Sequence, residues 1–160
     1  MKNYCCLAVL ICTMCVPCGI ALADADDSEN EVPGEVVSVV IQKESKGNDL
    51  AVGDKKDRFG NPKPSSQWAY GPLQISWRCV KDVNKHYGTH YKAEDCLGDR
   101  ELSVLIFKKY MKIYATHKTL GHNPKAEDYF GIWNGGPSGW KNYSTRVYVA
   151  KAMAMLSKLT

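Results

Sequence analysis

The segment 34–48 carries apolar and polar residues with the spacing of an α-helix. At about 100° per residue, four apolar side chains fall on one side: Val36, Val37, Val40 and Ile41. Glu44 lies in the middle of this apolar side, and Gly47 and Asn48 break the helix directly after it. Burial penalises the charged form of a carboxyl group, so the position suits a general acid. A helix-end glutamate that turns to solvent or pairs with a cation has the same pattern.

Helix caps and apolar spacing predict two longer helices in the middle of the chain. Ser76 is a favourable N-cap for a helix that ends near His86, and Gly88 stands just beyond that end. Asp99 caps a longer helix, in which apolar residues recur every three or four positions: Leu102, Leu105, Ile106, Tyr110 and Ile113.

Two further helices are predicted near the C-terminus. Asn123 and Pro124, a cap followed by proline, start one that reaches Trp133, and the segment Asn134-Gly135-Gly136-Pro137 ends it. The last helix begins near Thr145. Its expected buried face consists of Val149, Met153 and Leu156.

A long polar connection, rich in glycine and proline, runs from Lys46 to Ser66. Loops of this length in compact domains are often functional. Turn-forming residues between Asp54 and Asn61 favour a short hairpin there. Strands are expected only between Gly47 and Gln74. The prediction is therefore one mostly α (α+β) domain over residues 34–160, with a small β/loop region before the GPLQ motif.

The N-terminal residues 1–23 have the features of a secretory signal peptide. Lys2 precedes an apolar stretch from Leu7 to Ile20, and Ala21-Leu22-Ala23 is a small-x-small cleavage site. Residues 24–33 are acidic and nearly free of large apolar groups, which predicts a disordered leader. We therefore expect a secreted, extracellular protein with no membrane contact after signal removal.

The cysteines support export and suggest a disulfide. Five of the seven lie in the predicted signal peptide, and Cys79 and Cys96 remain. An even pair in an oxidising compartment predicts a bond between them, worth roughly 3 kcal/mol on the chain-entropy model. Two separately buried thiols are the alternative.

The formal net charge of +4 favours anionic partners without choosing among them. Acidic residues crowd the leader, so the domain itself is more basic, as suits bacterial walls, nucleic acid or acidic glycans. The sequence contains no nucleic-acid motif. His86 and His90 have Gly88 between them and no third ligand, so neither a metal nor a cofactor is expected. The protein is expected to be a monomer.

The remaining chemistry suits cleavage of a glycosidic bond. Such a reaction needs one protonated carboxylic acid, and a second carboxylate or the substrate itself to stabilise the oxocarbenium-like transition state. A polysaccharide also needs aromatic faces, which this chain supplies in Trp68, Tyr70, Trp77, Tyr129, Trp133, Trp140 and Tyr148. Packing in the core is the alternative use for each of them.

Three blocks in order resemble the lysozyme-like superfamily: IQKESKGN, AYGPLQIS, and IWNGGPSGW followed by YSTRVYVAKAM. The first is similar to the Glu-Ser pair of lytic-transglycosylase-type domains and goose-type lysozymes. The second is similar to their G-x-x-Q-[IV] motif and to a motif of invertebrate-type (destabilase) lysozymes. The third resembles sequences of both groups. The resemblance covers about residues 36–156, nearly all of the chain after the leader.

The resemblance implies a role for individual residues. Glu44 stands at the position of the general acid. Seven residues would contact substrate or shape its groove: Ser45, Tyr70, Gly71, Gln74, Trp133, Asn134 and Tyr148. In transglycosylases the residue that Tyr148 matches faces the catalytic glutamate.

The sequence also departs from these families. Invertebrate-type lysozymes are rich in disulfides and carry a catalytic Asp about a dozen residues after the Glu. Position 56 here is Lys, between Asp54 and Asp57, and both carboxylates also suit turns. Transglycosylases need no such Asp, because the hydroxyl of the substrate closes an anhydro product. Which reaction occurs therefore depends on whether Asp54 or Asp57 faces Glu44.

The expected function is that of a secreted muramidase, which cleaves β-1,4-glycosidic bonds of bacterial peptidoglycan with Glu44 as general acid. Two alternatives remain: a lytic transglycosylase, and a non-catalytic protein that binds peptidoglycan or chitin. Chitin-like glycans are also a possible substrate, because their sugar repeat is nearly the same.

Overall fold

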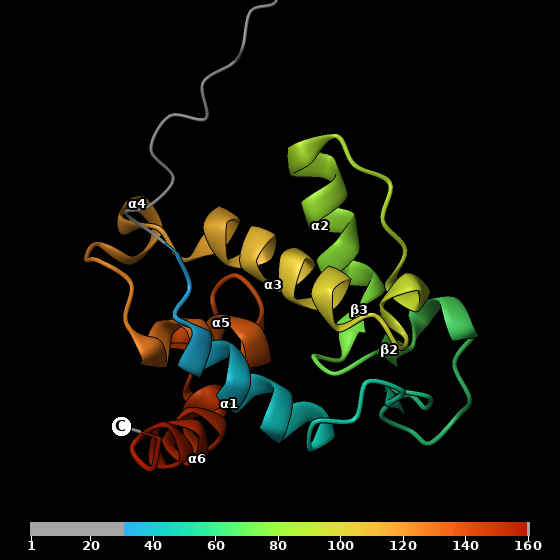
Figure 1. The fold of residues 1–160 in the computed structure, drawn as a ribbon, viewed down its shortest axis with the longest axis horizontal. Helices are drawn as coiled ribbons and strands as arrows, with labels where there is room; N and C mark the ends of the chain where they lie inside the picture. Colours follow the sequence, from blue (N-terminus) through green and yellow to red (C-terminus); the bar gives the residue numbers. More distant parts are fainter. Residues whose placement is uncertain (1–30, 160) are drawn as a thin grey trace, which may run out of the picture.

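The computed structural model describes residues 31–159, in which helices predominate (Figure 1). The α-helices are α1 Gly34–Ser45, α2 Trp77–Tyr87, α3 Arg100–Tyr114, α4 His117–Leu120, α5 Ala126–Gly135 and α6 Arg146–Leu156. Single turns of 3₁₀-helix are η2 Ser65–Gln67, η3 Ala93–Cys96, η4 Gly139–Lys141 and η5 Tyr143–Thr145.

A small antiparallel sheet lies between α1 and α2 in the sequence. Its strands are β1 Val52–Gly53, β2 Ala69–Tyr70 and β3 Ile75–Ser76, in the order β1-β2-β3. Val52 pairs with Tyr70, which in turn pairs with Ile75. The prediction of a mostly α domain with a small β region is confirmed, but the expected limit of the strands at Gln74 is wrong, because β3 lies wholly beyond it. At the expected hairpin, one bridge joins Lys56 to Pro62.

The helix α3 runs through the middle of the molecule (Figure 1). The sheet and α2 lie on one side of it, and α1, α5 and α6 pack together on the other. The largest fully buried side chains come from α3, α5, β3 and the turn before β3: Phe107, Ile106, Met111, Phe130, Ile132, Ile75 and Leu73. This core holds the ends of α1 and α5 in fixed positions beside the sheet.

The domain begins earlier than the sequence predicts. Val32 is buried, with 2% of its surface exposed, and Glu31 forms an ion pair with Lys108 of α3. Residues 31–33 therefore belong to the packed domain, and the predicted leader over 24–33 is wrong at its end. The signal peptide and the remainder of the leader lie outside the described residues and stay predictions.

The region before α5 also differs from the prediction. The helix begins at Ala126 after the N-cap Lys125, two residues beyond the predicted start at Asn123 and Pro124. Asp128 explains the shift, because its carboxylate accepts a hydrogen bond from the Lys125 amide at 2.9 Å. The short helix α4 was not predicted.

The predicted disulfide is wrong for this structure. Cys79 and Cys96 are both free and buried among core residues. Burial raises the pKa of both thiols, that of Cys96 to about 11. Disulfide formation needs a thiolate, so the raised pKa of both thiols disfavours it in the folded chain. Each cysteine serves instead as a small apolar core residue.

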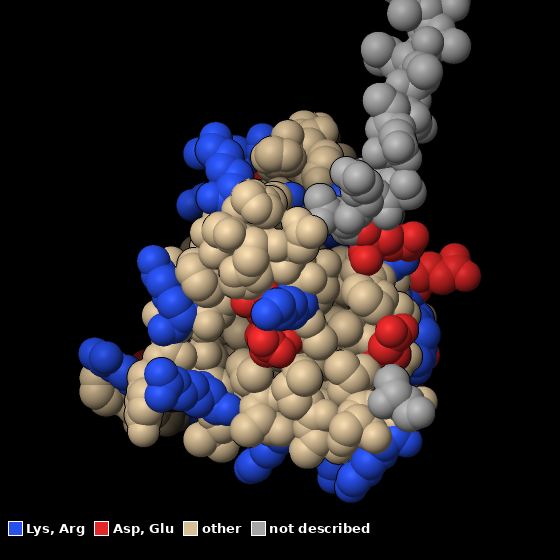
Figure 2. Space-filling view, turned by 90° about the vertical axis from the view of Figure 1, so that its left-hand side faces the viewer, with Lys and Arg blue, Asp and Glu red and all other residues tan. Residues whose placement is uncertain are grey.

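No helix within residues 31–159 is long and apolar enough to cross a membrane. On the face that Figure 2 shows, Lys and Arg side chains lie mainly around the margin, and Asp and Glu are fewer. The basic character expected from the sequence is thus spread over this face.

Candidate active site

Glu44 lies in the last turn of α1, half-buried, beyond the buried residues Val40 and Ile41. The helix ends one residue later at Ser45, and the C-cap residue Lys46 adopts the left-handed conformation with φ 56°, followed by Gly47 with φ 83°. The position of the helix end brings the Glu44 carboxyl to the surface of the core instead of into it.

Tyr148 of α6 is the partner of this carboxyl group. Its hydroxyl donates a hydrogen bond to Oε1 of Glu44 at 2.6 Å. The ammonium of Lys43 lies 4.1 Å from the centroid of the Tyr148 ring. The tyrosine is therefore held between a cation and a carboxyl group, an arrangement that fixes the orientation of the Glu44 side chain.

Burial is the largest influence on the ionisation of Glu44. Desolvation raises the pKa of its carboxyl group, while the hydrogen bond from Tyr148 and the charge of Lys43 partly oppose the rise. The pKa of the Tyr148 hydroxyl is also raised, because the residue is buried beside this carboxylate. Tyr148 thus stays a hydrogen-bond donor, and Glu44 retains its proton to higher pH than an exposed glutamate does.

Glu44 lines a cleft of about 860 Å³ where the helices meet the sheet. We call it the Glu44 cleft. The other lining residues come from the loop after β1, from β2 and β3, and from α2, α3 and α5: Asp54, Ala69, Gln74, Ser76, Arg78, Cys79, Asp82, Tyr110, Trp133, Asn134, Gly135, Gly136 and Pro137. Of the eight predicted substrate or acid residues, the structure brings Glu44, Gln74, Trp133 and Asn134 to this cleft.

Gln74 is held by a strained turn. Its backbone has a positive φ of 54°, and its side-chain amide donates to the Gly71 carbonyl at 2.9 Å. The rest of the side chain lies against Gly53 of β1, where a Cβ atom would be 2.1 Å from Oε1 of Gln74. Positive φ at a residue other than glycine is uncommon and is often retained where a site needs it.

Trp133 and Asn134 reach the cleft from the end of α5. The Trp133 ring packs edge-on against Phe107, with 4.8 Å between ring centroids. Gly131 lets α5 approach η4 closely, because a Cβ atom there would lie 2.7 Å from Cα of Trp140. This close packing fixes the end of α5 and leaves Asn134 exposed in the cleft.

The structure separates the two candidate aspartates. Asp54 lines the Glu44 cleft and forms an ion pair with Lys63. Asp57 does not line the cleft, and its carboxylate accepts hydrogen bonds from the amides of Phe59 and Asn61 and from the Asn61 side chain. These bonds lower the pKa of Asp57 and give it the role of a turn residue.

Four other predicted residues have positions outside the lining of the cleft. Ser45 donates to the Ile41 carbonyl within α1. Tyr70 is buried, and its hydroxyl donates to the Ser65 carbonyl at 2.9 Å. Gly71 forms the turn before Gln74 with φ 73°. Tyr148 reaches the site only through Glu44. Tyr70 and Gly71 belong to the strand and the turn that carry the cleft residues Ala69 and Gln74.

Arg78, Asp82 and Tyr110 line the cleft, although the sequence did not predict them as site residues. Arg78 and Asp82 are four residues apart on α2, so they share one helix face. Tyr114 donates a hydrogen bond to Asp82 at 3.0 Å. The i, i+4 spacing of opposite charges was a signal, but only the fold shows that this face of α2 borders Glu44.

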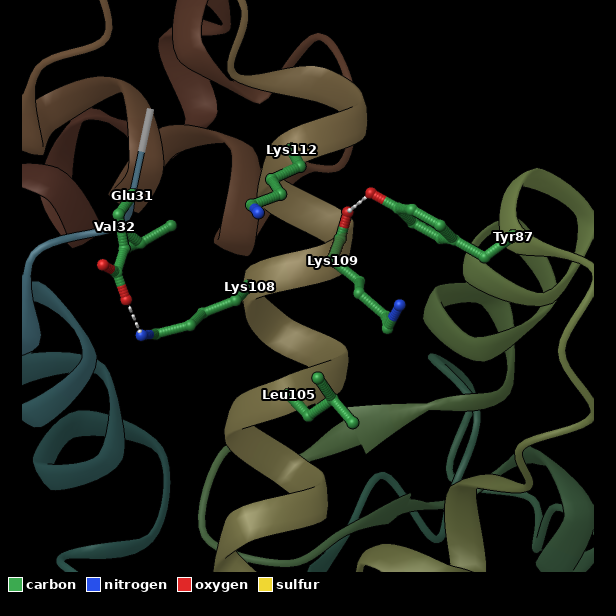
Figure 3. Close-up of a pocket in the computed structure, with 7 residues that line it drawn as sticks. All are labelled: Glu31, Val32, Tyr87, Leu105, Lys108, Lys109 and Lys112. Carbon is green, nitrogen blue, oxygen red and sulfur yellow. Dashed lines mark hydrogen bonds and ion pairs between the residues drawn. The ribbon is translucent and has the colours of Figure 1, made fainter. Parts of the chain in front are cut away.

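Another pocket, of about 620 Å³, lies along α3 (Figure 3). Three lysines project around it, and Lys108 reaches Glu31 while Lys109 lies over the Tyr87 ring at 4.1 Å. Glu31 is the one carboxylate in its lining, so the pocket lacks the acid chemistry of the Glu44 cleft. Among residues 31–159 no group of His, Cys, Asp and Glu could hold a metal ion.

Comparison with known proteins supports this fold. The structure of lysozyme from Meretrix lusoria, seen with a bound inhibitor and in complex with Aeromonas hydrophila PliI, is similar to 78% of this chain. That similarity spans 91% of the lysozyme, with a TM-score of 0.61 and 23% sequence identity. Tapes japonica lysozyme matches 81% of the chain and 92% of its own length, with a TM-score of 0.59 and 24% identity.

Neither a family model nor a curated protein sequence matches the chain. At these sequence identities the structural likeness shows the fold, which is the lysozyme-like fold that the three sequence blocks predict.

Proposed function

We propose that the protein is a secreted muramidase that hydrolyses β-1,4-glycosidic bonds of bacterial peptidoglycan. One observation carries the proposal: a half-buried carboxyl group of raised pKa, held by Tyr148, lines an open cleft in a lysozyme-like fold. Glu44 retains its proton to higher pH than an exposed glutamate and donates it to the oxygen of the leaving sugar.

The contacts of Glu44 suggest which oxygen carries that proton. The Tyr148 hydroxyl occupies Oε1, so Oε2 is left to hold the proton and face the substrate. Trp133 offers an aromatic face for a sugar ring, and the amides of Gln74 and Asn134 offer hydrogen bonds to sugar hydroxyl and acetamido groups.

Asp54 is the candidate second carboxylate, because it lines the same cleft as Glu44. It would stabilise the oxocarbenium-like transition state or activate water. Its ion pair with Lys63 holds the side chain in place. Asp57, whose carboxylate is bound within its own turn, is not proposed for catalysis.

A lytic transglycosylase is the second candidate. The contact between Tyr148 and Glu44 favours it, since transglycosylases, which this sequence resembles, place a tyrosine at their catalytic glutamate. In that reaction the substrate hydroxyl replaces the second carboxylate, and Glu44 acts first as acid and then as base.

Replacing Glu44 by Gln tests the enzyme assignment. Glu44→Gln should abolish clearing of a Gram-positive wall suspension, because the amide cannot donate the catalytic proton. Binding to insoluble peptidoglycan should persist. Full clearing by the variant would refute the role of Glu44, and binding without clearing by the unaltered protein would indicate a non-catalytic wall-binding protein.

The chemical ends of the products separate hydrolysis from transglycosylation. Mass spectrometry of released muropeptides should find reducing ends, and Asp54→Asn should reduce the rate at least about tenfold. Asp57→Asn, a matched change outside the cleft, should keep kcat. Anhydro ends together with an active Asp54→Asn variant would favour the transglycosylase.

A further inference from the structure

A second hollow, of about 560 Å³, adjoins the Glu44 cleft between the loop after β1 and the start of α2. Lys56, Arg58 and Phe59 of the loop after β1, with Trp77 of α2, contribute walls that the cleft lacks. We call it the Phe59 hollow. Its lining shares Asp54, Ser76 and Arg78 with the Glu44 cleft, so a polymer in the cleft has direct access to the hollow.

The charges in the Phe59 hollow are arranged to receive an anion. Four cationic side chains and two carboxylates line it. The two carboxylates are already engaged, Asp54 with Lys63 and Asp57 with the amides of its turn. Within residues 31–159, Lys56, Arg58 and Arg78 have no carboxylate partner, which leaves three cations facing solvent.

The aromatic groups of the hollow support its two arginines. Phe59 is 74% exposed, and the Arg58 guanidinium lies 4.6 Å from its ring centroid. Arg78 lies 5.4 Å from the centroid of the Trp77 ring. A guanidinium group stacked on a ring keeps its N–H edge available, and that edge matches a carboxylate with two parallel hydrogen bonds.

Peptidoglycan carries carboxylates beside its sugar strand, which match the cations of the hollow. Its sugar strand carries short peptides with several free carboxylates on alternate sugars, whereas chitin carries none. A strand lying in the Glu44 cleft would direct such a peptide sideways, and the volume of the hollow falls in the ordinary range of about 300–1,000 Å³ for ligand sites.

We propose that the Phe59 hollow binds the carboxylate-bearing peptide stem of a peptidoglycan strand whose sugars occupy the Glu44 cleft. The inference rests on the proposed function and adds to it the basis of substrate choice. Sugar contacts in the cleft would serve chitin and peptidoglycan alike, while Lys56 and Arg58 favour the strand that carries acidic peptides.

The test uses the double variant Lys56→Ala/Arg58→Ala, since neither residue lines the Glu44 cleft. Three substrates are compared: glycan strands with peptide stems, the same strands after an amidase has removed the stems, and chitohexaose. KM for stem-bearing strands should rise roughly fivefold to thirtyfold, as expected for two exposed charge contacts. KM for the other two substrates should not change.

The variant Lys85→Ala/Lys118→Ala is the matched control. It removes the same charge from exposed positions outside both hollows, so it should leave KM for stem-bearing strands unaltered. An equal rise for all three substrates, a rise also for the stripped strands, or no rise at all would overturn the proposal.

Affinity separates this inference from the proposed function. If the unaltered protein cleaves none of the substrates, the muramidase proposal fails. Calorimetric titration then decides the inference. It compares the affinities of stem-bearing and stripped strands for the unaltered protein and for the double variant. A stem-dependent loss of affinity supports it, and equal affinities refute it.

Discussion

At the scale of single residues, the site depends on how one carboxyl group is desolvated. Burial raises the pKa of Glu44, and Tyr148 and Lys43 limit the rise by favouring the ionised form. These opposing influences set the pH at which the acid loses its proton. The tyrosine therefore tunes the acid as well as orienting it.

Removing the Tyr148 hydroxyl should shift the pH profile. Tyr148→Phe deletes the hydrogen bond that lowers the pKa of Glu44, so that pKa should rise further and the alkaline limb of kcat/KM should move to higher pH. Initial rates across the acidic to neutral range measure the shift. Tyr143→Phe, at a residue that is 79% exposed, is the matched control and should leave the limb in place. A shift to lower pH would contradict the assignment.

Stability should follow the same ionisation. The pKa of Glu44 is raised from its ordinary 4.5. Its contribution to stability is therefore complete below that unfolded value and is lost as pH rises through the folded pKa. Glu44→Gln cannot ionise, so above that folded pKa its melting temperature should equal or exceed that of the unaltered protein. Thermal melts from acidic to neutral pH check this, and a lower melting temperature at neutral pH would contradict it.

At the scale of elements, capping residues and apolar spacing were enough to predict most of the longer helices. Ser76 and Asp99 cap α2 and α3 as expected, since their side chains accept from Cys79 and Leu102 amides within three residues. The start of α5 was missed because Asp128, inside the helix, supplies the cap. With this cap the N-cap residue is Lys125, and none of the usual N-cap residues Ser, Thr, Asp or Asn marks the helix start.

The contents of the cleft were predictable only in part. Motif spacing found Glu44, Gln74, Trp133 and Asn134, but local sequence could not distinguish Asp54 from Asp57, since both stand near turn residues. The path of the loop decides, by turning one carboxylate into the cleft and binding the other within the turn. The disulfide failed for a related reason, because spacing does not report how the core encloses each sulfur.

The turn before Gln74 should tolerate no side chain at Gly71. This residue has φ 73°, and a Cβ atom would lie 2.3 Å from the Cys96 carbonyl. Gly71→Ala should cost about 3 kcal/mol or more of unfolding free energy, from backbone strain and overpacking. Gly60→Ala, at φ 88° with open space around it, isolates the strain and should cost only about 1 kcal/mol. Urea unfolding compares them, and equal costs would refute the close approach.

At the scale of the whole molecule, the fold is held by core packing without a covalent link between Cys79 and Cys96. Both thiols should resist Ellman's reagent in the native chain, since burial raises their pKa values. Denaturation without reductant should expose two reactive thiols in a chain that begins after Ala23. Titration before and after denaturation measures both values. No reactive thiol after denaturation would show that the disulfide forms after all.

The hydrogen bond between Glu44 and Tyr148 joins residues that are 104 positions apart. A ribosome completes α1 long before it reaches α6, so a growing chain holds its acid without the residue that orients it. Under the proposed function, a chain stopped before Arg146 lacks both Tyr148 and the packing of α6 on α1 and α5, so it should clear no cell walls. Chain order would thus delay the proposed activity until synthesis is nearly finished.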